Sequence, residues 1–320
     1  MNDNQLYANG RVAVLSTKLL AQDKLTRLAE CNNVAEAVKV LTENGYGGMT
    51  IDNANDYETL LRAELDSALS VFKELCYDVN AVKFVLAKYD YLNAKALMKC
   101  KYMRVDGIVY CYNQGSISPE QMQSAIVADD YSAFSKNMAE ALDAIDTAYA
   151  NGKRSPQTVD VTLDKAMYKD LALYAKKCSF KPIRQLLDYQ INTTNLMTLY
   201  RAKKARLTLE ICQDLLIDGG SVPRETLLKL WDNEQAVIDL PSEYKAFYAL
   251  CSADNQTLTS AENERNSYVY KLIADNVDLM TIQPVLEYFL KKVNEIDRVR
   301  RIITGIKNGQ DKDKLKDLIK

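Results

Sequence analysis

An internal repeat is the sequence feature that most constrains the fold of this 320-residue chain. A short polar pattern, placed toward the end of a long amphipathic stretch, begins at residues 90, 192 and 295, so its copies are spaced 102 and 103 residues apart. The copies are Asp90–Leu97, Asn192–Leu199 and Glu295–Ile302. Because a fixed period marks a repeated structural unit, we expect three similar units, which favour a ring or socket over an enzyme pocket.

The other end of each unit repeats as well. A small residue or a proline precedes an acid and then an apolar residue in Ala21–Leu25, Ser118–Met122 and Pro223–Leu227. Each pattern predicts the start of a helix, where an acid complements the helix dipole and proline is tolerated. The two patterns together divide the chain into units 1–116, 117–221 and 222–320, with the N- and C-terminal helices shared between units.

The composition predicts an all-α protein. Hydrophobic residues make up 48% of the chain, which is ample for packed cores, and the chain holds 6 Pro and 11 Gly, so few positions force a helix to stop. Apolar residues recur at helical spacing in four segments, and we find no convincing strand signal. These expected helices cover residues 60–75, 82–100, 183–199 and 282–296.

A polar pair interrupts the apolar stripe of each long helix. Asn93 lies in the stripe between Val82 and Leu97, with Asp90 one turn earlier, and Asn195 occupies the same place in the second copy. A buried amide without a partner costs about 1–3 kcal/mol, so these side chains must be hydrogen-bonded. Either they connect each unit to the next through helix-to-helix hydrogen bonds, which we favour, or they face a central hole and contact a partner.

The sequence offers little for catalysis. It has no histidine, which removes the commonest general base and metal ligand. The glycine-rich stretch Gly45–Gly48 lacks the spacing of a phosphate loop. The net charge of −2 gives no basic excess for nucleic-acid binding. We therefore expect no catalytic residue, no cofactor, no metal and no nucleic-acid partner.

The remaining composition bears on location. The seven cysteines form no C-x-x-C pair and their odd number favours a reducing compartment. The first residues lack the basic start and apolar stretch of a secretory signal, and no apolar run reaches the length of a membrane helix. We expect a protein that is soluble or peripherally attached to a membrane.

Four segments carry a resemblance to a known family. Tyr7–Val12 is similar to the opening Y-x-N-A-R-[IV] helix of the C subunit of archaeal and bacterial V-type ATP synthases, a family that includes the d subunit of the eukaryotic vacuolar ATPase. Leu41–Gly47 resembles its L-x-x-T-x-Y-G turn, Asp90–Lys95 its D-x-x-N-x-K, and Glu295–Gly305 its E-I-x-N-[LI]-R-x-I-x-x-G. The resemblance covers residues 5–309.

The resemblance implies three helical domains around a pseudo-threefold axis in a funnel shape. It also implies a non-catalytic socket that couples the central shaft, made of D- and F-type subunits, to the membrane rotor ring at the cytoplasmic face, with membrane contact only through the ring. Arg298 stands where the family usually has Asn, and Asn192 where it has Asp. The candidate structural or interface positions are Asn9, Arg11, Asp90, Asn93, Lys95, Asn192, Asn195, Glu295, Arg298 and Arg300.

Two other classes of protein stay open at the level of sequence. One is a free-standing α-solenoid scaffold, although its repeats are commonly 20 to 50 residues long, shorter than the spacing here. The other is an all-helical lyase or synthase, which would need clustered carboxylates on one helix face. Asp129 and Asp130 begin such a pattern, but it does not continue.

Overall fold

The computed structural model describes residues 3–253 and 258–317, which belong to two compact units. Unit 1 is formed by the two ends of the chain, up to Tyr77 and from Ile273 onward, and unit 2 spans Asp78–Leu272. Helices, 3-10 helices included, take up 76% of the described residues, and these residues contain no β-strand. The all-α prediction is confirmed.

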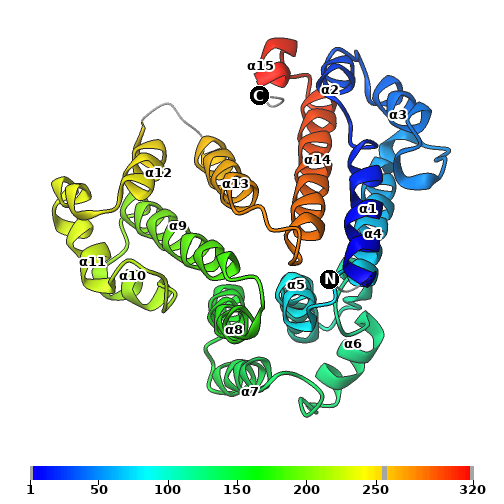
Figure 1. Ribbon diagram of the computed structural model, residues 1–320. Helices are drawn as coiled ribbons and strands as arrows, with labels where there is room; N and C mark the ends of the chain where they lie inside the picture. Colours follow the sequence, from blue (N-terminus) through cyan, green and yellow to red (C-terminus); the bar gives the residue numbers. More distant parts are fainter. Residues whose placement is uncertain (1–2, 254–257, 318–320) are drawn as a thin grey trace. The chain divides into compact units, whose positions relative to one another are not determined.

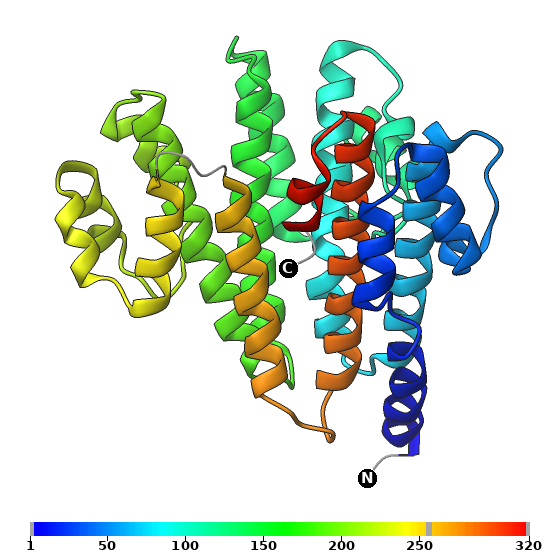
Figure 2. The ribbon, with the colours of Figure 1, turned by 90° about the horizontal axis from the view of Figure 1, so that it is seen from above.

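Unit 1 is built around two long helices, α4 and α14, that pack against each other, with α1 alongside α14 (Figures 1 and 2). The rings of Phe72 and Phe289 meet at this contact with centroids 4.9 Å apart. Both helices present the apolar stripes expected from the sequence to this core. The helices of unit 1 are α1 (Asp3–Ser16), α2 (Gln22–Ala29), α3 (Val34–Glu43), α4 (Tyr57–Leu75), α14 (Gln283–Lys307) and α15 (Lys312–Asp317), with short 3-10 helices at Tyr46–Gly48 and Ala54–Asp56.

Unit 2 has α5 and α8 at its centre, and α7 packs on α8 (Figure 1). Two ion pairs link α5 to α8: Lys95 to Asp164 and Lys99 to Asp160, each 2.6 Å long. From the first ion pair to the second, the residue number rises by four in α5 and falls by four in α8, so the two helices run antiparallel. The helices of unit 2 are α5 (Val79–Met103), α6 (Pro119–Val127), α7 (Lys136–Ala150), α8 (Pro156–Lys177), α9 (Pro182–Lys204), α10 (Leu209–Leu215), α11 (Arg224–Asp232), α12 (Ser242–Ser252) and most of α13 (Leu258–Asp275), with 3-10 helices at Ile108–Tyr110 and Glu234–Asp239.

The three predicted helix starts are confirmed. Helix α2 begins at Gln22, α6 at Pro119 and α11 at Arg224. The hydroxyl of Ser118 accepts a hydrogen bond from the backbone N–H of Gln121, so it satisfies one of the amides left open at the start of α6. Each short helix therefore starts where the repeated pattern places it.

The C-terminal helix α15 is held against α14 by a close approach at Gly305. A Cβ atom added at Gly305 would lie 2.3 Å from Cδ2 of Leu315, which is buried. We expect Gly305→Ala to displace Leu315 and to lower the free energy of unfolding by about 1–3 kcal/mol, the usual cost of overpacking. Urea unfolding followed by circular dichroism measures this change.

Gly10 is the matched control, because it lies inside α1 and a Cβ added there meets nothing within 4 Å. Gly10→Ala should be neutral or stabilising by up to about 1 kcal/mol, since alanine favours helix. Equal unfolding midpoints for Gly305→Ala and Gly10→Ala would show that α15 does not depend on this contact.

Candidate functional site

Two polar side chains of α5 hold the chain segment that leads into α6. Asn93 is fully buried; its Oδ1 accepts a 2.7 Å hydrogen bond from the N–H of Tyr112 and its Nδ2 donates a 2.8 Å bond to the carbonyl of the same residue. One turn earlier, Asp90 accepts bonds from the N–H and the hydroxyl of Ser116, at 2.8 and 2.6 Å, and from the N–H of Ile117 at 3.3 Å. We call such a contact, from a polar side chain of a long helix to the backbone just before a short helix, a clasp.

Helix α9 forms a second clasp with the same pattern. Asn195 binds both backbone groups of Ile217, each at 2.8 Å. Asn192 accepts a bond from the N–H of Val222 at 3.3 Å and donates one to the hydroxyl of Ser221 at 2.9 Å. The held segment leads into α11, as the segment held by α5 leads into α6.

A glycine makes room for each of these two clasps. A Cβ added at Gly115 would lie 2.3 Å from Oδ1 of Asp90, and one added at Gly220 would lie 2.4 Å from Oδ1 of Asn192. Both distances are far below a van der Waals contact. The backbone approaches the polar side chain so closely that only glycine fits without a shift.

Helix α14 forms the third clasp, and it holds a segment near the start of the chain. Oε2 of Glu295 accepts a 2.6 Å hydrogen bond from the N–H of Leu20, two residues before α2 begins. Leu20 directly precedes the N-cap of α2, as Ile117 does for α6 and Val222 for α11. All three copies of the repeat therefore place a polar side chain on an equivalent backbone amide.

The carboxylate of the third clasp is buried and paired. Nζ of Lys292 lies 2.7 Å from Oε1 of Glu295 and also pairs with Glu64, which accepts a 2.7 Å bond from the N–H of Gly47. Burial opposes the charge on Lys292, but Glu295 and Glu64 outweigh it and raise the pKa of this lysine. Burial, together with Glu295 and Glu64, also raises the pKa of Tyr46. The lysine stays charged and the phenol stays neutral at physiological pH.

The other candidates on α14 lie outside this clasp. Arg298, which aligns with Asn93 in the repeat, is half-buried and makes no hydrogen bond or ion pair within the described part of the chain. Arg300 pairs with Glu58 at 3.1 Å and with Asp297 at 2.8 Å. The third copy therefore keeps the carboxylate half of the polar pair and lacks the amide half.

The two candidates on α1 make separate contacts within unit 1. Nδ2 of Asn9 donates a 2.8 Å hydrogen bond to the carbonyl of Leu279, and its Oδ1 has no partner among the described residues. Arg11 pairs with Glu74 and donates to the hydroxyl of Tyr7. These contacts fasten α1 to the loop before α14 and to α4.

The structure corrects one expectation about the asparagines. Asn93 and Asn195 are buried as predicted, but the predicted partner, a neighbouring helix, is wrong: both bind loop backbone within their own predicted repeat unit. The reason is that a loop entering a helix carries free backbone groups, whereas a helix face has none to offer. The glycines of the clasps were missed, although Gly115-Ser116 and Gly220-Ser221 repeat at a spacing of 105 residues.

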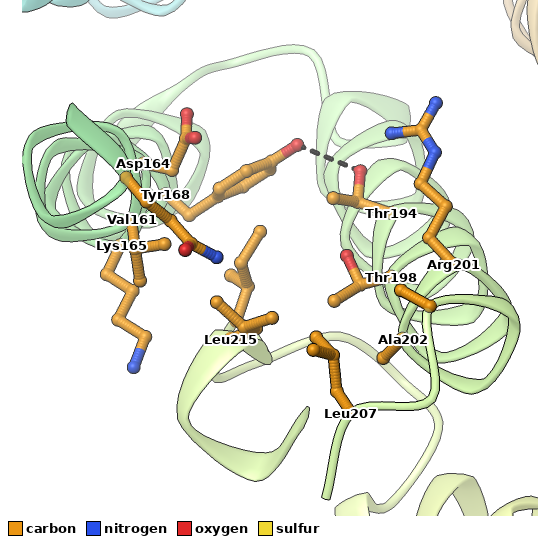
Figure 3. A pocket seen from close by; sticks show the side chains of 13 residues that line it. Val161, Asp164, Lys165, Tyr168, Thr194, Thr198, Arg201, Ala202, Leu207 and Leu215 are labelled. Atoms are coloured by element: carbon orange, nitrogen blue, oxygen red, sulfur yellow. Dashed lines mark hydrogen bonds between the residues drawn. The ribbon is translucent and has the colours of Figure 1, made fainter. Parts of the chain in front are cut away.

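A pocket of about 370 Å³ lies between α8, α9 and the segment around α10 (Figure 3). The hydroxyls of Tyr168 and Thr194 share a 3.2 Å hydrogen bond across it. Burial raises the pKa of Tyr168, so its hydroxyl stays protonated and serves as a hydrogen-bonding group. The charged ends of Lys165 and Arg201 extend away from the centre of the pocket in Figure 3. The pocket can bind a small molecule. Its acidic and basic side chains do not converge on one point, as the acid and base of a catalytic site would.

The described residues also bear on whether the chain spans a membrane or holds a metal ion. No helix there combines the length and apolar character of a membrane span. No group of three or more carboxylates or thiols there is placed to hold a metal ion.

Comparison with known proteins identifies the family. The sequence model of the family described as ATP synthase (C/AC39) subunit matches residues 8–318. The chain belongs to this family.

Relatives in the ATP synthase (C/AC39) subunit family are similar along almost their whole length. The C subunit of the A-type ATP synthase of Thermococcus kodakarensis is 25% identical over 336 residues, covering 98% of this chain and 89% of the relative. The protein of the same name from Thermococcus gammatolerans is 26% identical, with the same coverage, and that from Methanosarcina mazei is 25% identical, covering 99% of this chain and 92% of the relative. The family match includes all three clasps.

The clasps predict which substitutions lower the free energy of unfolding and which leave it unchanged. Asn93→Leu and Asn195→Leu each remove two hydrogen bonds to the backbone of one residue, and a buried group that loses its partner costs about 1–3 kcal/mol. Asn195→Leu should cost more, because Ile217 is buried whereas Tyr112 is half-exposed and water can replace part of its hydrogen bonding. Chemical unfolding of the purified variants measures both losses.

Arg298→Gln is the matched control from the third copy of the repeat. It removes no hydrogen bond or ion pair among the described residues, so it should change the unfolding free energy by less than about 0.5 kcal/mol. If Arg298→Gln destabilises the chain as much as Asn93→Leu does, the clasp is not the source of the loss.

Proposed function

We propose that the chain is a non-catalytic central-stalk subunit of a rotary ATP synthase, a socket that couples the central shaft to the membrane rotor ring. The observation that carries this proposal is the family match, which extends over residues 8–318. The relatives named as C subunits of A-type ATP synthases align with this chain over about nine-tenths of their own length.

The clasps support a role in transmitting force. A part that passes torque from one subunit to another must keep its internal angles under load. Each clasp fixes the direction in which a short helix leaves a long one, and the backbone hydrogen bonds of the second clasp are buried, where a hydrogen bond is strongest. The long helices α5, α9 and α14 satisfy their own backbones and pack at the density of a protein interior, which resists deformation.

The third clasp supports the predicted division into repeat units. Glu295 near the end of the chain holds Leu20 near its beginning, so the last long helix is followed in space by the first short helix. A closed order of this kind fits three units, 1–116, 117–221 and 222–320, that share the N- and C-terminal helices around a pseudo-threefold axis. We infer that three units in this order form a funnel with a central opening for a shaft.

The partners follow from this role. We infer contacts with D- and F-type shaft subunits on one side and with the rotor ring on the other, at the cytoplasmic face of the membrane. Attachment is peripheral and depends on the ring. The sequence holds no histidine for general acid-base chemistry, and its near-neutral charge fits protein partners better than nucleic acid.

Removing this chain from the assembled enzyme tests coupling directly. We expect vesicles that hold the complex without it to lose ATP-driven ion transport, while the catalytic head keeps hydrolysing ATP, because a socket carries torque and takes no part in the chemistry. Adding back the purified chain should restore transport. Ion uptake and phosphate release, measured on the same vesicles, separate the two activities.

Two results would contradict the proposal. One is ATP-driven transport that persists at full rate without the chain. The other is ATP turnover by the purified chain itself that a point substitution in it abolishes.

A further inference from the structure

One end of unit 1 carries a cluster of exposed apolar side chains. It is formed by the N-terminal half of α1, the residues just after α4 and the loop before α14. The start of α1 and this loop lie at the same end of unit 1 in Figure 2. Side chains of this size are normally buried, and contiguous exposed ones mark interaction sites. We call the cluster the apolar end patch; its members are Leu6, Tyr7, Tyr77, Val277, Leu279 and Met280, each about half exposed or more.

The patch is held in place by hydrogen bonds to the backbone of its loop. Gln5 and Asn9 both donate to the carbonyl of Leu279, at 3.1 and 2.8 Å, and the hydroxyl of Tyr77 donates to the carbonyl of Met280. These three bonds use the carbonyl groups of Leu279 and Met280, while the side chains of both residues stay exposed to solvent. Polar residues are therefore used to present apolar ones to solvent.

The charged residues near the patch indicate what kind of surface it can bind. Residues 272–290 hold three acids, including Asp275 and Asp278, and no lysine or arginine. An anionic membrane surface attracts clusters of basic residues, which this loop lacks. The cytoplasmic loops of membrane proteins, in contrast, carry an excess of lysine and arginine. On the α1 side the charge of Arg11, which contacts Tyr7, is paired with Glu74. The acidic border on the loop side complements such loops.

We propose that the apolar end patch docks on the cytoplasmic loops of the membrane rotor ring. The partner surface is apolar at its centre and basic at its edge. Tyrosine and methionine, which are enriched in protein interfaces, make up half of the patch. This inference rests on the proposed function, because it assigns the ring-facing surface of the same socket.

Leu279→Lys tests the assignment with the full-length chain. Only the backbone of Leu279 is hydrogen-bonded and its side chain is 57% exposed, so the fold should tolerate the change. A lysine there meets both the apolar centre and the basic edge of the ring loops. We expect binding to the purified, detergent-solubilised ring to weaken at least tenfold, with binding to the purified shaft unchanged. Val277→Lys should repeat the effect at a second position of the patch.

Ile238→Lys is the matched control, because Ile238 lies in unit 2 and is 76% exposed. It adds the same charge at an exposed apolar residue and should leave ring binding unchanged. Melting temperatures of all three variants confirm that each is folded.

Vesicles containing phosphatidylglycerol distinguish lipid from protein as the partner, because the added lysine should strengthen adsorption to an anionic membrane and weaken binding to the ring. Wild-type adsorption that Leu279→Lys strengthens, with ring binding unchanged, would overturn the assignment in favour of lipid. Loss of shaft binding with ring binding intact would overturn it in favour of the shaft. Wild-type chain that fails to bind the ring at all would refute the proposed function itself.

Discussion

A buried side chain that hydrogen-bonds the backbone entering the next short helix is the interaction on which the rest of this structure depends. Loops between helices carry N–H and C=O groups that no helix satisfies, and burying them without partners is costly. The clasps of α5, α9 and α14 meet this need and, in doing so, fix where each short helix starts. The same long helices also present their apolar faces to the core.

Three different side chains perform the same task, and the chemistry around each explains the difference. Asp90 accepts three hydrogen bonds, which suits a charged carboxylate, and Asn192 both accepts and donates, since its segment offers a hydroxyl as well as an amide. Glu295 is longer and reaches an amide near the opposite end of the chain; its charge is compensated by Lys292. The geometry is repeated although the residues are not.

Most of what the sequence predicted came from the spacing of its apolar residues and from its internal repeat. The long helices, the short-helix starts and the burial of Asn93 and Asn195 all follow from apolar spacing and helix-start signals, which act over a few residues. The partners of those asparagines did not follow, because sequence spacing along one helix says nothing about which loop folds back on it. Arg298 differs from Asn93 for a reason that the sequence does show, since a guanidinium has no oxygen to accept a backbone N–H. The matching Gly-Ser pairs were a usable signal, since a close backbone approach requires glycine.

Native-state hydrogen exchange measured residue by residue tests the central claim most directly. The amides of Leu20, Ile117 and Val222 lie outside regular helices, and loop amides normally exchange within the least stable part of a protein. If clasps hold the helices together, these three amides should open only with the long helices, and their opening free energies should match those of α5, α9 and α14. Exchange at the rate of ordinary exposed loop amides would show that the clasps break freely and do not organise the fold.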